Sequence, residues 1–182
     1  MGKKLVIAPA PEAGATAAAR DLPEPPACIN TALRRAARRL GNLYDDAFDA
    51  LGLKATQVGL LAEIERLTAA GDGVPPALQD LAARLSIQVS ALTHALRPPI
   101  RDGLVELWQD ERDGRTKRAA LTPAGQACLR EAYAHWSEVN RRVEAVLGKE
   151  PAAALRALAD HVASDDFLAA YREAEAEGSG AG

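Results

Sequence analysis

The sequence predicts a mainly α-helical fold with one small β-hairpin. Aromatic residues make up only 4% of the 182 residues, and alanine and leucine dominate, which favours helices over a β-sandwich. Apolar residues recur at three- and four-residue steps in several segments, the spacing of helices that bury one face. One short stretch near the middle instead alternates apolar and polar residues before a tight turn, which is typical of a hairpin.

The N-terminal part of the chain predicts an arm followed by two helices. We expect residues 1–27 to form a flexible arm, because they are rich in Ala, Pro and Gly and end in the helix-disfavouring segment LPEPPA. Over residues 28–53, apolar residues recur on one face of a long helix, and Gly52 is a typical helix end. A second helix follows Thr56, and residues 69–76 form a loop.

Two short helices are predicted next. Residues 77–85 form the first, and Ser86 begins a turn. The second helix has Val89, Leu92 and Leu96 on its buried face. Two helices joined by so short a turn are typical of a helix-turn-helix, in which the first helix supports the second.

The following segment predicts the hairpin. Residues 104–108 (LVELW) alternate as a strand does, residues 112–114 (RDG) form a tight turn, and residues 116–121 form the return strand. The two short helices and the hairpin together make residues 78–122 a winged helix-turn-helix.

The C-terminal part predicts two further helices. Thr122 is a common N-cap and Pro123 a common first helical residue, so a long helix should begin there and run to about residue 147. Another helix is expected over residues 151–171. Residues 173–182, acidic and then rich in Gly and Ser, should form a flexible tail.

The long helices should flank the winged block within one domain, residues 28–172. They lie in residues 28–53 and 123–172. The apolar stripes of the first and last helices have too few partners within one small chain, so we expect them to be dimerisation helices of an obligate homodimer.

The winged block carries polar side chains that suit double-stranded DNA. A helix fits the major groove, and its unburied residues can contact base edges and phosphates. Arginine at a hairpin tip suits the electronegative minor groove. The candidate DNA contacts are Gln88, Ser90, Ala91, Thr93, His94 and Arg97 on the helix, and Arg112, Arg115 and Lys117 on the hairpin.

Charge alone leaves two functions open. The whole chain has a net charge of −3, which argues against a protein that coats nucleic acid indiscriminately. From Leu78 to Arg118, seven lysines and arginines stand against six acids, so this block carries only +1. The fold could bind specific DNA through a local basic face, or serve as a protein-interaction module without DNA binding.

Four motifs, in order and at matching spacings, resemble the multiple-antibiotic-resistance-regulator (MarR) family. They are LTxxLRP at residues 92–98, DGLVE at 102–106, DxRDxR at 110–115 and LTPAG at 121–125. With the flanking helices, the resemblance covers roughly residues 28–171. It implies a homodimeric bacterial transcriptional regulator, a ligand-responsive repressor on a pseudo-palindromic operator, with the terminal helices as the dimer interface.

The sequence departs from the family pattern in its second short helix. Pro99 and Ile100 stand where leucine and an acidic residue are usual, and His94 replaces a frequent arginine. A double proline should end this helix near Arg97. These changes bear on the operator sequence and the affinity for it rather than on the fold.

The resemblance also implies an effector, because the family often binds small aromatic acids between its dimer helices and its DNA-contacting block. An aromatic or anionic effector could contact Arg34, Arg38, Tyr44, His135 and Trp136. The alternative for each of these residues is a solvated face, the core or an interface.

The chain has two cysteines, Cys28 and Cys128, for which different roles are expected. A branch of the family senses oxidants through a cysteine near the start of the first helix, which makes Cys28 a candidate redox sensor. A helix N-terminus lowers a thiol pKa, but an inert cysteine is the alternative. Cys128 is expected to pack on an apolar helix face.

We expect no catalytic site, metal site or cofactor. A Gly-rich phosphate loop and the HExxH and GxSxG motifs are absent, and the two cysteines and three scattered histidines lack ligand spacing. No stretch reaches 18 apolar residues, and the apolar N-terminal run is too short for a signal peptide. We therefore expect a cytoplasmic protein without a membrane partner.

Overall fold

The computed structural model describes residues 27–110 and 113–179. Almost all of the predicted arm, and the predicted DNA contact Arg112, lie outside these residues. The elements follow in the order α1 (Ile29–Phe48), η1 (Asp49–Leu51), α2 (Ala55–Ala70), α3 (Leu78–Arg84), α4 (Val89–Ala95), α5 (Arg97–Arg101), β1 (Val105–Gln109), β2 (Lys117–Leu121), α6 (Pro123–Leu147), α7 (Lys149–Val162) and α8 (Asp165–Ser179). The predicted mainly helical fold with one hairpin is confirmed.

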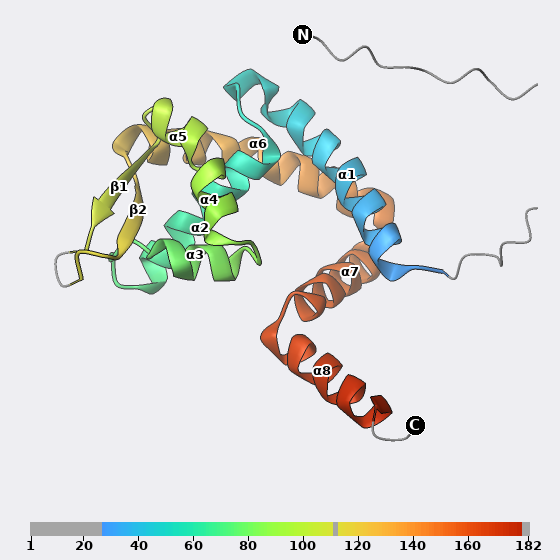
Figure 1. Ribbon diagram of the computed structural model, residues 1–182. Helices are drawn as coiled ribbons and strands as arrows, with labels where there is room; N and C mark the ends of the chain where they lie inside the picture. The colour runs from blue at the N-terminus through green and yellow to red at the C-terminus, as the bar shows by residue number, and fades with distance from the viewer. Residues whose placement is uncertain (1–26, 111–112, 180–182) are drawn as a thin grey trace, which may run out of the picture.

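The elements form a winged block and a set of long helices (Figure 1). Helices α2 to α5 and the hairpin gather at one side, with the hairpin at the edge. The long helix α6 leaves β2, packs against α1 and α2, and joins α7 at its far end. From there α8 projects away from the body.

Strands β1 and β2 pair antiparallel, with Val105 opposite Leu121 and Gln109 opposite Lys117. The hairpin is also joined to the segment that precedes α3. The N–H of Ala119 donates to the carbonyl oxygen of Pro76 at 3.1 Å, and Ala77 forms a β-bridge with Arg118. The wing is therefore fixed to the first helix of the helix-turn-helix.

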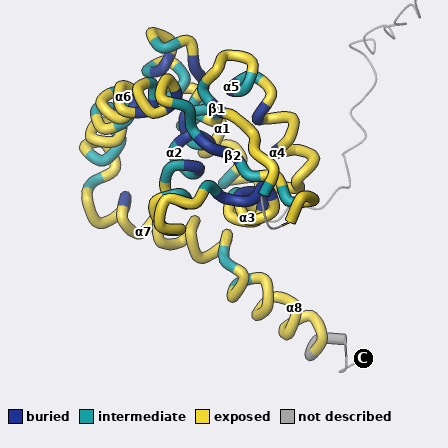
Figure 2. The backbone as a smooth tube through the Cα atoms, turned by 90° about the vertical axis from the view of Figure 1, so that its left-hand side faces the viewer, coloured by how far each residue is buried: buried dark blue, intermediate teal, exposed yellow. Residues whose placement is uncertain are grey.

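A single apolar core lies around α2. Fully buried side chains come from α2 and from the helices on either side of it, and Figure 2 shows the buried residues gathered there. The largest of these side chains are Phe48, Leu61, Ile64, Leu81, Leu92 and Leu96. Among the described residues, no polar or charged side chain is buried.

The double proline ends α4 as predicted, but the chain stays helical. Helix α4 stops at Ala95, and Pro98 and Pro99 occupy the first turn of α5. Proline is tolerated there because the first residues of a helix have no intrahelical partner for their N–H groups. The short helix α5 therefore follows α4 directly, where no further helix was predicted.

The C-terminal prediction is wrong in two places. One helix was expected over residues 151–171, but α7 and α8 are separate because Ser164 interrupts them, its hydroxyl accepting from the N–H of Phe167 at 3.2 Å. A flexible tail was expected over residues 173–182, but α8 continues to Ser179. Alanine and glutamate, which dominate the start of that segment, are strong helix formers.

The start of α6 is built as predicted and packs very closely on the chain before β1. The hydroxyl of Thr122 accepts from the N–H of Gly125 at 3.0 Å as an N-cap, and the N–H of Thr122 donates to the carbonyl oxygen of Leu104 at 3.0 Å. A Cβ atom on Gly125 would lie 2.0 Å from that same carbonyl oxygen. Only glycine fits this contact.

We predict that Gly125→Ala lowers the free energy of unfolding by about 3 kcal/mol, because the new methyl group must displace backbone. Gly59→Ala in α2 is the control, since a Cβ there meets nothing within 4 Å. It should leave stability unchanged or raise it by up to about 1 kcal/mol. Urea unfolding of both variants tests this; equal stabilities would contradict the close contact.

Candidate nucleic-acid interface

Helix α4 presents an exposed face of small and polar residues. Leu92 and Leu96 are 0% and 1% exposed and fix the rotation of the helix about its axis. The predicted contacts on and beside this helix are all exposed: Gln88, Ser90, Ala91, Thr93, His94 and Arg97. The small side chains at Ser90 and Ala91 allow another molecule to approach the helix backbone closely.

Val89 was predicted to be buried with these leucines, but it is 41% exposed. Its side chain lies in the first turn of α4 and lines an open groove between α3 and the wing. Helical spacing placed Val89 on the leucine face, but the buried part of that face begins only at Leu92, about one turn after Val89. The exposed face of α4 is wider than predicted.

The tip of the wing is organised by one carboxylate. Asp113 Oδ1 accepts from the backbone N–H of Arg115 at 3.0 Å, and Asp113 Oδ2 accepts from the hydroxyl of Thr116 at 2.8 Å. The side-chain amide of Gln109 donates to the carbonyl oxygen of Gly114 at 2.7 Å. These bonds order the backbone of the turn and leave the side chain of Arg115 exposed.

The base of the wing has a different contact, an arginine–aspartate pair. The guanidinium of Arg118 donates through Nε to Asp110 Oδ2 at 2.5 Å and through Nη1 to the carbonyl oxygen of Pro75 at 2.7 Å. The side chains of Arg118 and Asp110 are only 27% and 15% exposed. The other carboxylate oxygen of Asp110 accepts from the N–H of Asp113 at 3.0 Å.

Helix α4 and the wing share one groove of about 470 Å³. Thr93 from the helix and Arg115 and Lys117 from the hairpin all line it. The fold therefore brings together predicted contacts that lie more than twenty residues apart in the sequence.

A second groove, of about 440 Å³, lies between α2 and α6. It is lined by Gly59, Ala62, Glu63, Arg66, Tyr133, Trp136, Ser137 and Asn140. Trp136 meets the rings of Tyr44 and Phe48 edge-on at centroid distances of 6.4 and 6.3 Å. The hydroxyl of Tyr44 donates to Asn140 Oδ1. The groove therefore has an aromatic wall and a polar rim.

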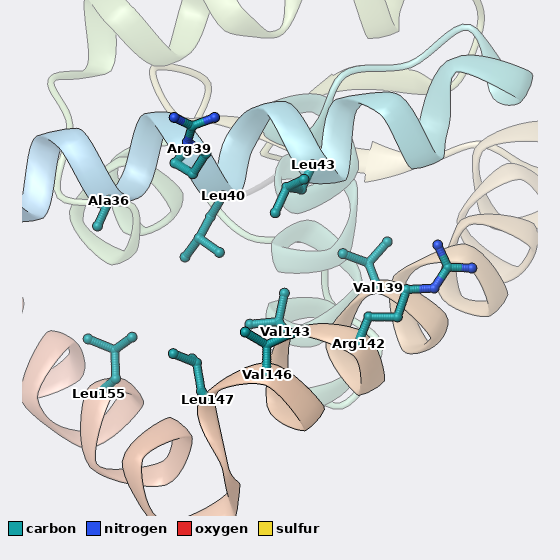
Figure 3. A pocket seen from close by; sticks show the side chains of 10 residues that line it. All are labelled: Ala36, Arg39, Leu40, Leu43, Val139, Arg142, Val143, Val146, Leu147 and Leu155. Atoms are coloured by element: carbon teal, nitrogen blue, oxygen red, sulfur yellow. The ribbon is translucent and has the colours of Figure 1, made fainter.

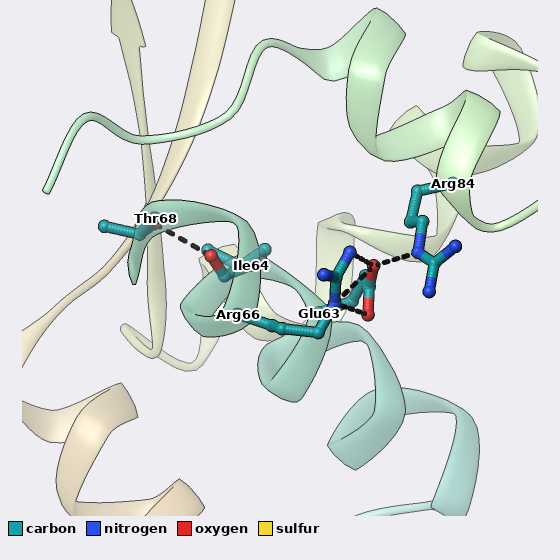
Figure 4. Close-up of polar contacts among 5 residues, drawn as sticks. All are labelled: Glu63, Ile64, Arg66, Thr68 and Arg84. Atoms are coloured by element: carbon teal, nitrogen blue, oxygen red, sulfur yellow. Dashed lines mark hydrogen bonds and ion pairs between the residues drawn. The ribbon is translucent and has the colours of Figure 1, made fainter. Parts of the chain in front are cut away.

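Glu63 connects this groove to the helix-turn-helix (Figure 4). Its carboxylate accepts from Arg66 on the same helix at 2.6 Å and from Arg84 Nε, at the end of α3, at 3.1 Å. The hydrogen bonds from Arg66, reinforced by Arg84, hold the pKa of Glu63 below its ordinary value. The three-residue spacing of Glu63 and Arg66 could have indicated their pairing, whereas nothing in the sequence indicates Arg84.

The predicted effector residues are only partly brought together. Trp136 lines the α2–α6 groove, Tyr44 contacts its ring, and His135 is half-buried beside it in sequence. Arg34 and Arg38 are exposed on α1 and do not line this groove. Their role in effector binding stays a prediction.

Cys28 is the exposed N-cap residue of α1. A hydrogen bond with Thr31 lowers the pKa of its thiol. Redox sensing by Cys28 stays a prediction. Cys128 is half-buried against the core, and burial raises the pKa of its thiol, which agrees with a packing role.

A third groove, of about 400 Å³, is almost wholly apolar (Figure 3). Helices α1, α6 and α7 line it, with Leu40 and Leu43 facing Val143, Val146 and Leu155. Val146 is 87% exposed, although it is aliphatic.

Two further observations concern other classes of site. Within residues 27–110 and 113–179, no three His, Cys, Asp or Glu side chains are grouped so that they could hold a metal ion. In the same part of the chain, no helix has the length and apolar character needed to cross a membrane.

No family model and no curated protein sequence matches the chain. Solved structures do. The Mycobacterium tuberculosis transcriptional regulator MosR, in complex with DNA, is 34% identical, with a TM-score of 0.61 over 74% of this chain and 97% of that one. The repressor CouR bound to a 23-mer DNA duplex is 22% identical, with a TM-score of 0.65 over 75% and 93%.

A MarR variant from Escherichia coli, complexed with operator DNA, is 20% identical, with a TM-score of 0.64 over 73% of this chain and 91% of that one. At such identities the last two likenesses show the fold alone. The identity to MosR, over almost the whole of that protein, shows more. This chain belongs to the MarR family of transcriptional regulators.

Proposed function

We propose that this regulator is a ligand-responsive repressor that binds a pseudo-palindromic operator as a homodimer. The observation that carries the proposal is the groove shared by α4 and the wing, where Thr93, Arg115 and Lys117 lie together beside the exposed face of α4. Structures of MosR, CouR and the MarR variant with DNA support it.

The arrangement suits double-stranded DNA in two places at once. With Leu92 and Leu96 held in the core, α4 can lie in the major groove, where Ser90 and His94 meet base edges. The wing tip then lies toward the flanking backbone and minor groove, where an arginine is electrostatically favoured. Because the chain is acidic overall, its affinity should depend on this local surface rather than on net charge.

A second copy of the chain is the proposed occupant of the apolar groove. Apolar side chains also remain exposed along α7 and α8: Leu155, Leu158, Val162, Leu168 and Tyr171. Leu155 also lines the groove, and Leu158 and Val162 follow it at helical spacing along α7. Figure 1 places α7 and α8 at the end of the molecule away from the wing. A two-fold axis through this surface would present two copies of α4 to one duplex, which matches a pseudo-palindromic site.

The α2–α6 groove is the proposed effector site. Its aromatic wall and the exposed guanidinium of Arg66 suit a small aromatic acid. A ligand that binds the groove more tightly in a dimer with the wrong separation of its α4 helices would shift the population away from DNA. The Glu63–Arg84 ion pair lies between this groove and α3.

The direct test is a gel-shift with the intergenic DNA beside the protein's own gene, in competition with random DNA at physiological salt. The proposal requires preferential binding of one fragment, reduced when a half-site is scrambled. Equal binding of all fragments, or none, would overturn it and favour the protein-interaction module.

We predict that Arg115→Ala weakens operator binding by about 1–3 kcal/mol, because an arginine contact in the minor groove is lost. Arg141→Ala is the matched control, since it removes the same charge near the C-terminal end of α6, whereas the wing precedes the N-terminal end of that helix. Fluorescence anisotropy with a labelled operator measures both. If the two variants bind equally well, the wing does not engage DNA as proposed.

Substitutions in α4 should separate base contacts from phosphate contacts. His94 is exposed in the last turn of α4, one turn after Ser90 on the same face, so His94→Ala should change the preferred operator sequence. Arg97, one turn later beside the double proline, should contact the DNA backbone, so Arg97→Ala should weaken operator and random DNA alike and make the salt dependence shallower. Selection from a randomised operator library measures the first effect, and a salt titration the second. An unchanged preference profile for His94→Ala would contradict this placement of α4.

We predict that Val146→Glu converts the dimer to a monomer of 19.2 kDa. The carboxylate costs nothing in the monomer, where this position is 87% exposed. Taken out of water in the interface, it should weaken association by about a hundredfold or more. Ala127→Glu, exposed at the other end of α6, is the control. Sedimentation equilibrium measures both; a Val146→Glu variant that stays dimeric would place the interface elsewhere.

A further inference from the structure

The wing tip has strong bonds within itself and few to the body of the protein. Arg115 and Thr116 both donate to the carboxylate of Asp113, and such local bonds set the shape of a turn without setting its direction. Direction has to come from a contact between the tip and an element that does not move with it. Among the described side chains, the one that bonds both to the beginning of the tip and to the body is Arg118.

We propose that Arg118 is a positioning residue that aims the wing at DNA through Asp110. The inference rests on the proposed DNA-binding function. Nη1 of the guanidinium donates to the carbonyl oxygen of Pro75, in the segment that leads into α3, at 2.7 Å. Nε donates to the Asp110 carboxylate at 2.5 Å, and that carboxylate also accepts a hydrogen bond from the N–H of Asp113. A continuous chain of bonds therefore runs from the body to the residue that organises the tip.

The geometry distinguishes this role from a direct DNA contact. The side chain of Arg118 is 27% exposed, and its donors already point at two acceptors of the protein. Arg115 and Lys117, by contrast, are exposed and line the groove shared with α4. Arginine suits the bridging role because its planar fork binds two acceptors at fixed directions, whereas a lysine ammonium is a single point charge.

The first test needs no DNA. Arg118→Met keeps the aliphatic stem and removes the fork. In the free protein, hydrogen exchange of the Asp113, Arg115 and Thr116 amides should become about tenfold faster, while the amides of α2 and the thermal midpoint stay near those of the wild type. Unchanged exchange at the tip would overturn the proposal. If Arg118→Met does not fold, Asp110→Asn replaces it, because it removes the ionic partner and keeps an oxygen for the N–H of Asp113.

The second test is a double-mutant cycle on an operator that the wild-type protein binds. Arg118→Met should weaken binding about tenfold, while Arg141→Met, its matched control, leaves it unchanged. In the Arg115→Ala background, Arg118→Met should cost less than about twofold, because the contact it positions is already absent. Arg118→Lys should restore part of the affinity.

Additive losses, or a shallower salt dependence from Arg118→Met in the Arg115→Ala background, would overturn the proposal and make Arg118 a phosphate contact. Full operator affinity in Arg118→Lys would also make Arg118 a phosphate contact, because a positive charge without the arginine geometry would then be enough for binding. If the wild-type chain binds no operator, the proposed function fails, and the hydrogen-exchange result still decides whether Arg118 holds the wing.

Discussion

The burial of α2 is the constraint on which the rest of this structure depends. Val58, Leu61 and Ile64 are 0% exposed, and α1, α3, α6 and β2 all pack against this one helix. Each fully buried aliphatic side chain contributes about 1.5–3 kcal/mol, so two turns of α2 hold a large part of the stability. The directions of the two short helices, the hairpin and α6 are all set relative to it.

Apolar burial fixes these positions only coarsely, because the hydrophobic effect has no directional preference. The core contains no buried polar side chain among the described residues. Directional bonds are instead found outside the core: in the exposed Asp113 turn, between Arg118 and Asp110, and between Glu63 and Arg84. Hydrogen bonds weaken steeply with angle, so they can define the orientation of a surface that the core supports.

The sequence predicted what depends on neighbours along the chain. The spacing of Leu92 and Leu96 determined which face of α4 is exposed, and the Thr-Pro pair before α6 marked its start. Features that depend on distant packing could not be predicted. Val89 has helical spacing to the buried leucines, but its exposure depends on where the wing lies.

Long-range polar partners leave no local signal either. Arg84 meets Glu63 across 21 residues, and Arg118 meets Pro75 across 43. The break between α7 and α8 did have a local signal that was missed, because Ser164 is a preferred N-cap residue and Asp165 and Asp166 follow it in the first turn of α8. The α2–α6 groove was missed at Arg66 and Asn140, since no spacing relates them before the two helices are packed together.

The unequal burial of the two ends of the molecule has a consequence for gene control. Among the residues of α7 and α8 whose burial is described, one, Ala152, is buried, so within a single chain little holds these helices in place. In the proposed homodimer, ordering these helices and joining two chains would be one event, favoured by concentration. At concentrations where most chains are still monomeric and the operator is far from saturated, operator occupancy would then rise with the square of the protein's concentration, and a modest change in its synthesis would switch its target genes sharply.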